Sequence, residues 1–142
     1  MGERSGYTPD EWQTLQFAPF WIFSALLGTY RNFDRLDYDA FSRSLQTASA
    51  APGRLVQEVI GSVTAERGRL AEEFAADSRT IGRGLCAVAA VLSRAPSDEA
   101  DMFKEMLISR VGEGVARARG RYGQVISKDD AKTLELVAQF LA

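Results

Sequence analysis

The stretch that decides the fold is residues 17–30, FAPFWIFSALLGTY, which contains five aromatic side chains and no charged one. Pro19 is predicted to interrupt or kink the chain, and if it begins a new helix, this apolar helix runs from about Pro19 to Tyr30. Such a helix spans about 18 Å, whereas the hydrocarbon core of a bilayer is about 30 Å thick. A short helix that is apolar all round is typical of a buried core helix, so no membrane insertion is predicted. The centre of the core is predicted at Phe20, Trp21, Phe23, Leu26 and Leu27.

The composition is that of a globular protein with one domain. A chain of 142 residues can bury one substantial core, so residues 1–142 are predicted to form a single domain, with residues 1–8 as a flexible N-terminus. Hydrophobic residues make up 46% and charged residues 25%, which are ordinary values for a soluble protein. The formal net charge of −2 indicates neither a nucleic-acid partner nor binding to an anionic membrane.

Several kinds of chemistry lack the residues that they need. The chain has no histidine, which removes the commonest general base and transition-metal ligand. Cys86 is the one cysteine, which favours a reducing compartment, and the N-terminus has no cleavable signal pattern, so a cytoplasmic location is predicted. Cys86 lies in the apolar run GLCAVAAVL and is predicted to be a buried packing residue. No catalytic residue, cofactor or enzymatic activity is predicted.

The remaining sequence is predicted to form helices. Thr8-Pro9-Asp10-Glu11 has the pattern of a capping box with proline at the first helical position. Further helices are predicted after caps at Asp37, Ser97 and Ser127 and over residues 78–95. Residues 53–77 are predicted to form two shorter helices, because Gly61 and Gly68 weaken that segment. The helix over 98–120 is predicted to stop at Gly120 or Gly123.

Helical spacing of apolar residues identifies the buried face of each segment. The predicted core positions are Phe41, Leu45, Ala48, Leu55, Val59, Val63, Leu70, Phe74, Ile81, Leu85, Val88, Leu92, Leu134, Val137, Ala138 and Leu141. In residues 98–120, Phe103, Leu107 and Val111 share one face, and Met102, Met106 and Ser109 share another. No segment alternates like a strand, so the fold class is predicted as all-α, a compact bundle of about seven helices.

Two regions follow the same plan. A helix ending near Tyr30 is followed by the loop RNFDRLD and a helix capped by Asp37, and a helix ending near Arg119 is followed by GRYGQVIS and a helix capped by Ser127. The similarity is one of pattern and not of identity. Both a pseudo-repeat of two helical halves and a chance match remain open.

The last forty residues carry a family resemblance. The run FKEMLISRVGEGVARARGRYGQVISKDDAKTLELVAQFL, residues 103–141, resembles the tellurite-resistance TerB-like domains, and residues 20–45 resemble the first copy of the same unit. The resemblance implies a compact bundle of roughly seven helices built around two such halves. It also implies a bacterial protein of a stress response or of membrane-linked signalling complexes, with a protein partner and no established catalysis.

The resemblance also implies where a metal would bind, and this chain departs from that pattern. Some members of the family are thought to bind a divalent metal through acids in an Ala-Asp-Gly turn and several residues later. The corresponding turns here are Leu27-Gly28-Thr29 and Ala118-Arg119-Gly120, and only the later acids remain, at Asp39 and at Asp129 or Asp130. No metal site is therefore predicted.

Two charged clusters and one aromatic group are the candidate sites. Asp34, Asp37 and Asp39 either offer oxygen ligands to Ca²⁺ or Mg²⁺, or serve as helix-start and solvated charges. The arginines Arg110, Arg117, Arg119 and Arg121, with Lys128, either bind a phosphate or an acidic partner, or complement a helix C-terminus. The aromatic side chains of Trp12, Trp21, Phe17, Phe20 and Phe23 form either an apolar pocket or, the preferred interpretation, the core.

Three functions are compatible with this sequence. The first is a non-enzymatic interaction module of the TerB-like type, acting as a monomer or homodimer. The second is a sensor domain that binds a divalent metal or a small ligand. The third is a helical hydrolase that uses carboxylates and a metal, for which no two-metal constellation is recognisable.

Overall fold

The computed structural model describes residues 3–27, 35–119 and 126–142, and all of its regular elements are helical. The elements are the 3-10 helix η1 (Glu3–Gly6), the α-helices α1 (Pro9–Leu27), α2 (Arg35–Ser49), α3 (Arg54–Ala65), α4 (Arg67–Ala76), α5 (Ile81–Leu92) and α6 (Ser97–Glu105), the π-helical segment η2 (Met106–Gly112), and the α-helices α7 (Glu113–Arg119) and α8 (Lys128–Leu141). Because α6, η2 and α7 follow one another without a break, the described residues form seven long helices and no strand. The predicted all-α bundle of about seven helices is confirmed.

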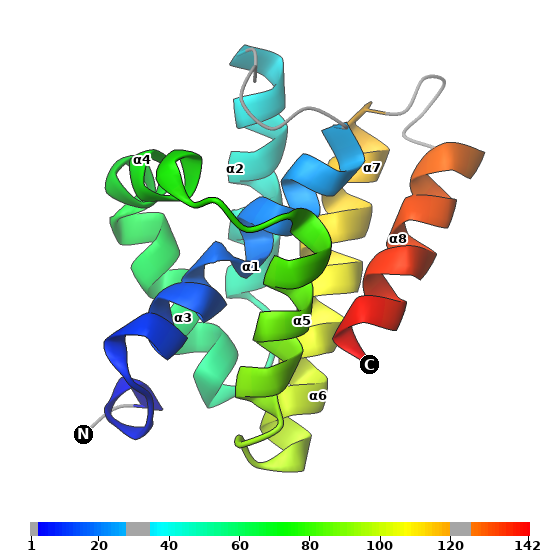
Figure 1. Ribbon diagram of the computed structural model, residues 1–142. Helices are drawn as coiled ribbons and strands as arrows, with labels where there is room; N and C mark the ends of the chain where they lie inside the picture. The colour runs from blue at the N-terminus through cyan, green and yellow to red at the C-terminus, as the bar shows by residue number, and fades with distance from the viewer. Residues whose placement is uncertain (1–2, 28–34, 120–125) are drawn as a thin grey trace.

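Helix α1 lies in the middle of the bundle, with the other helices around it (Figure 1). It starts with the predicted capping box: the Thr8 amide donates to Glu11 Oε1 at 2.9 Å, and the Glu11 amide donates to Thr8 Oγ1 at 3.1 Å. Of the two outcomes predicted for Pro19, the start of a new helix is wrong, because α1 continues through Pro19. A proline inside a helix costs about 3 kcal/mol. Burial of each large side chain near Pro19 contributes about 1.5–3 kcal/mol, so several such side chains together outweigh this cost.

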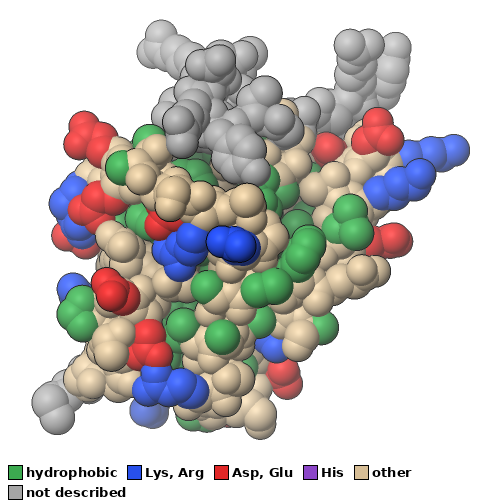
Figure 2. Space-filling model, viewed as in Figure 1, with side chains coloured by type: hydrophobic (Ala, Val, Ile, Leu, Met, Phe, Trp, Pro, Cys, Tyr) green, Lys and Arg blue, Asp and Glu red, His purple; other side chains and the backbone are tan. Residues whose placement is uncertain are grey.

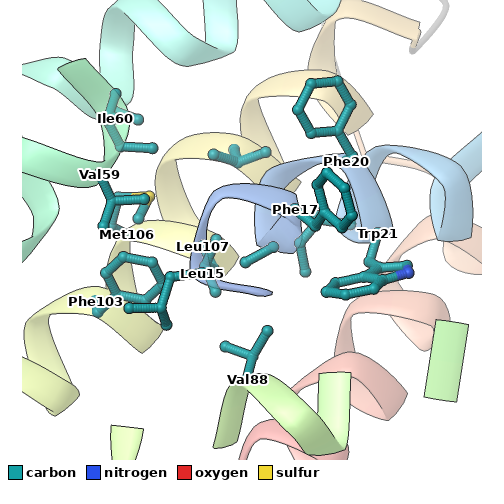
Figure 3. Close-up of a cluster of buried hydrophobic side chains, with 14 of the residues drawn as sticks. Leu15, Phe17, Phe20, Trp21, Val59, Ile60, Val88, Phe103, Met106 and Leu107 are labelled. Carbon is teal, nitrogen blue, oxygen red and sulfur yellow. The ribbon is translucent and has the colours of Figure 1, made fainter. Parts of the chain in front are cut away.

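The opening stretch is the core of the protein, as predicted. Phe20, Trp21, Phe23 and Leu26 are buried, and Leu27 is partly buried against them. Figure 3 shows Phe17, Phe20 and Trp21 projecting from α1 into this cluster. The aromatic rings are in contact with one another rather than lining an empty pocket: Phe17 meets Trp21 edge-on at 5.7 Å between centroids. Within the described residues no helix is both long and apolar enough to cross a membrane.

The core stripes predicted from helical spacing are also confirmed, with two exceptions. Ile81 is half-buried and Ala138 is exposed, while the other predicted positions are buried. Two glycines permit close packing around this core. A methyl group placed on Gly84 of α5 would lie 2.1 Å from the Trp21 ring, and one on Gly112 would lie 2.5 Å from Leu134 Cδ2 of α8. A side chain at Gly84 would therefore push α5 away from α1, whereas one at Gly112 would displace the end of the Leu134 side chain.

Several helix ends differ from the prediction. Helix α2 begins at Arg35, so Asp37 lies within it rather than capping it. Ser97 is the first residue of α6 and makes no capping bond. The residue before α3 has no capping side chain of its own; instead Glu99 accepts a hydrogen bond from the Leu55 amide at 2.9 Å. A carboxylate from another helix therefore accepts a hydrogen bond from one of the free backbone amides at the start of α3, and the linear sequence could not show this contact.

Other helix ends agree with the prediction. Ser127 caps α8, because its Oγ accepts a hydrogen bond from the Asp130 amide at 3.1 Å. Residues 54–76 form two helices as predicted, although the break is at Glu66 rather than at a glycine. Residues 31–34 and 120–125, which make up most of the two loops of the suggested pseudo-repeat and include the predicted stops at Gly120 and Gly123, lie outside the described residues.

The N-terminal residues that the structure describes lie against the domain. The Arg4 amide donates to Glu58 Oε2 at 3.3 Å, and the Arg4 guanidinium lies 6.0 Å from the centre of the Trp12 ring. The Tyr7 ring lies 5.9 Å from the same tryptophan. These contacts connect η1 to α1 and α3.

Candidate anion-binding site

The site lies where α2 passes the long helix formed by α6, η2 and α7. The two helices come close at Gly114 of α7, where a methyl group would lie 3.3 Å from Ser44 Cβ of α2. The π-helical segment η2 directly precedes α7. Its last residue is Gly112, and a methyl group added there would lie 3.2 Å from the carbonyl oxygen of Leu107. Single π-helical turns inside α-helices frequently occur at functional sites, because the wider turn changes the direction of the following side chains.

A hollow of about 280 Å³ opens between these helices, and we call it the arginine hollow. Its lining residues are Arg43, Ser44 and Thr47 of α2, Ser109 and Arg110 of η2, and Gly114 and Arg117 of α7. Three arginines from two helices therefore line one small volume. A guanidinium group offers five N–H donors and is the preferred partner of carboxylates and phosphates in proteins.

The charges in the arginine hollow are only partly neutralised. Arg117 forms an ion pair with Glu113 at 3.3 Å, and more than half of its side chain is exposed. Arg43 and Arg110 have no carboxylate partner within the part of the chain that the structure describes. An exposed i,i+4 pair contributes only about 0.3–0.5 kcal/mol, so an incoming anion can compete with Glu113 for Arg117.

The hydroxyl groups of the arginine hollow already use their protons. Ser44 donates to the Phe41 carbonyl at 2.7 Å, Thr47 donates to the Arg43 carbonyl at 3.1 Å, and Ser109 donates to Glu105 Oε1 at 2.6 Å. The donors left for a ligand are therefore the guanidinium N–H groups. This arrangement favours an acceptor-rich, negatively charged group.

The structure brings together part of the arginine cluster predicted from the sequence. Arg110 and Arg117 line the arginine hollow, whereas the side chains of Arg119 and Arg121 lie outside the described residues. Lys128 is exposed at the start of α8 and is not among the lining residues. Sequence reasoning missed Arg43, because it lies on another helix, and no local pattern connects it with Arg110.

The predicted acidic candidates do not gather in the described part of the chain. Asp39 and Asp129 are exposed, and Asp130 is half-buried in the first turn of α8. Asp34 and the side chain of Asp37 lie outside the described residues. Among the residues that are described, no three cysteine or acidic side chains are placed to hold a metal ion together.

The prediction that Cys86 is buried is wrong, because its side chain is exposed. Leu85 and Val88 face the core from α5, and Cys86 follows Leu85 by one residue, which turns it about 100° away around the helix. Figure 2 shows hydrophobic side chains at the surface over α5 and α8. On α8, Leu136 is 55% and Phe140 43% exposed.

A second arginine environment contrasts with the arginine hollow. Arg79, in the α4–α5 connection, donates to both carboxylate oxygens of Asp77 and to Thr14 Oγ1, and it lies 4.9 Å from the centre of the Trp21 ring. The hydrogen bond from Arg79 holds the pKa of Asp77 below its usual value, against an opposing effect of burial. This arginine is satisfied within the protein and is not a ligand site.

The comparisons with known proteins give no match: no family model, no curated protein and no solved structure is similar to this chain.

Proposed function

We propose that this protein is a non-enzymatic binding module that recognises an anionic group in the arginine hollow. The observation that carries the proposal is the convergence of Arg43, Arg110 and Arg117 on one hollow in which only Arg117 has an ion pair among the described residues. Clustered guanidinium groups repel one another, and a bound phosphate or carboxylate would relieve that repulsion.

The TerB-like resemblance of residues 103–141 extends this proposal to a protein partner in a bacterial stress response, of the tellurite-resistance type, in the cytoplasm. In that setting the anionic group would belong to the partner. The second candidate is a sensor domain for a small ligand, and it is favoured by the size of the neighbouring hollow described below. Both candidates use the same three arginines.

The test is a titration with inorganic phosphate, followed by NMR chemical-shift changes of backbone amides. We expect shifts confined to α2, η2 and α7, and weaker binding at high salt because the site is exposed and screened. The double variant Arg43→Ala/Arg110→Ala should lose about tenfold or more in affinity, since a hydrogen bond to a charged group is worth about 1.5–3 kcal/mol.

The matched control is Arg54→Ala/Arg83→Ala, which removes the same charge at two exposed arginines outside the hollow. This control should bind phosphate like the wild type. Equal losses in the two double variants would show that phosphate responds only to net charge, and the proposed site would be rejected. Circular dichroism of both variants should remain that of the wild type, because the substituted side chains are not part of the core.

A further inference from the structure

A second hollow adjoins the arginine hollow along the same long helix. It measures about 540 Å³, and its apolar lining comes from Ala51 and Pro52, after α2, and from Met102 and Met106. Met106 is fully buried at its base, and Met102 is half-buried. We call it the methionine hollow. Methionine side chains are flexible and polarizable, so they adapt to apolar groups of different shapes.

The two hollows adjoin one another, because Ser109 and Arg110 line both of them. We call the two hollows together the groove. From Arg110 back to Met102 the helix advances eight residues, about 12 Å. A ligand that reached from the arginines to Met102 would therefore cross from a positively charged end to an apolar one.

Acidic side chains restrict what the apolar end can accept. Asp101 and Glu105 lie along the methionine hollow, and Glu105 Oε1 accepts a hydrogen bond from Ser109 at 2.6 Å. A second negative charge on the ligand would meet these carboxylates and be repelled. The groove thus favours a negative charge at the arginine end only, with an uncharged apolar portion beside the acids.

We propose that this groove binds an anionic amphiphile, with a phosphate or carboxylate head among Arg43, Arg110 and Arg117 and an unbranched apolar tail along Met102 and Met106. The proposal rests on the arginine site proposed above and assigns its ligand class. Charge complementarity orients the head, and burial of the tail against the methionines supplies the additional affinity.

The experiment compares ethyl phosphate with hexyl phosphate, which share a head and differ by four methylene groups. A fully buried methylene group strengthens binding about fourfold, and a methylene in an open groove contributes about half of that free energy, which is about twofold. Over four methylene groups we therefore expect hexyl phosphate to bind at least about tenfold more tightly than ethyl phosphate. NMR shifts that hexyl phosphate alone produces should fall on Ala51, Met102 and Met106. A tail of the same length ending in a carboxylate should lose most of this advantage.

The tail contribution is tested separately with Met102→Gln, which keeps the length of the side chain but makes it polar. This variant should bind hexyl phosphate only about as well as ethyl phosphate, whereas Met102→Leu should keep the preference. The NMR shifts of the wild-type protein locate the bound tail even if one of these variants does not fold. Binding of ethyl phosphate with no gain for hexyl phosphate would overturn the amphiphile proposal alone, and failure of both probes to bind would overturn the arginine site as well.

Vesicle flotation distinguishes the source of the ligand. Vesicles of phosphatidylcholine are compared with vesicles that also contain phosphatidic acid, whose phosphate head is that of the soluble probes. Flotation that requires phosphatidic acid and is lost in Arg43→Ala/Arg110→Ala would mean that the groove takes the amphiphile from a bilayer. Hexyl phosphate binding without flotation would mean that the ligand is free in solution. Flotation unchanged in the double variant would exclude the groove as the lipid site.

Discussion

Arg79 and the arginines of the arginine hollow have the same functional group in opposite situations. Arg79 has a carboxylate two residues away, a threonine hydroxyl from α1 and the face of Trp21, so its donors and its charge are used inside the protein. Arg43 and Arg110 meet at an open hollow, where the described residues supply no carboxylate to them. The contrast shows that arginines of one chain differ in whether the protein itself meets their charge, and the proposed binding site rests on the two that have no carboxylate partner among the described residues.

The difference has a consequence for stability. Around Arg79 the polar contacts cover one edge of the aromatic core, so changes there should affect folding. Around the arginine hollow the guanidinium groups lie at the surface of the bundle, so changes there should affect binding and leave folding nearly unchanged. Three predictions examine the Arg79 side of this comparison.

The largest expected effect is that of Trp21→Ala. Trp21 is 1% exposed and contacts Phe17, Phe74 and Arg79, so its removal leaves a cavity and should lower the free energy of unfolding by about 3–5 kcal/mol. Thermal or urea unfolding followed by circular dichroism measures the loss. Leu136→Ala, at an exposed position, should stay within about 0.5 kcal/mol of the wild type. An unchanged melting temperature for Trp21→Ala would mean that this side chain is not part of the core.

The next effect is that of Gly84→Ala, which adds a methyl group at the same tryptophan. Because that group would lie 2.1 Å from the indole ring, the ring or α5 must move, and we expect a loss of about 1–3 kcal/mol in urea unfolding. Gly61→Ala is the matched control, since no atom lies within 4 Å of its added methyl group. It should stabilise α3 by about 0.5–1 kcal/mol. If both variants were stabilised, the close packing of Trp21 against α5 would be disproved.

The smallest effect concerns the pH dependence of the Asp77–Arg79 pair. The hydrogen bond from Arg79 lowers the pKa of Asp77 in the folded protein. The stabilisation from this pair is therefore fully present above the unfolded pKa of an aspartate, about 3.9, and is lost as the pH falls through the folded pKa of Asp77. Asp77→Asn should therefore lower the free energy of unfolding by about 0.5–1 kcal/mol at neutral pH and by much less near pH 2.

The control for this prediction is Glu72→Gln, which removes an exposed carboxylate that has no ion pair among the described residues. It should change stability by less than about 0.5 kcal/mol at both pH values. A loss in Asp77→Asn that is the same at neutral and acidic pH would show that the ion pair is not its cause. Arg110→Ala should behave like the Glu72 control in unfolding, although we expect it to weaken phosphate binding.

The sequence by itself determined the fold class, the core and several helix ends. Helical spacing of apolar residues is a local property, so the buried faces of α2, α3 and α5 could be predicted without knowing what covers them. The capping box at Thr8 and the cap at Ser127 were predictable for the same reason, because donor and acceptor are three residues apart. The prediction failed at Pro19, where burial by distant helices outweighs a local preference against proline.

Only the tertiary structure decided which distant side chains meet. Spacing along one helix placed Arg110 and Arg117 together and put Met102, Met106 and Ser109 on one face, but it could not bring Arg43 to them. The sequence likewise could not show that Glu99 caps α3 or that Gly84 receives Trp21. The physical reason is that helix periodicity sets the direction of a side chain relative to its own axis. Which residue it meets depends on how whole helices pack, and that is set by the shape and volume of the entire core.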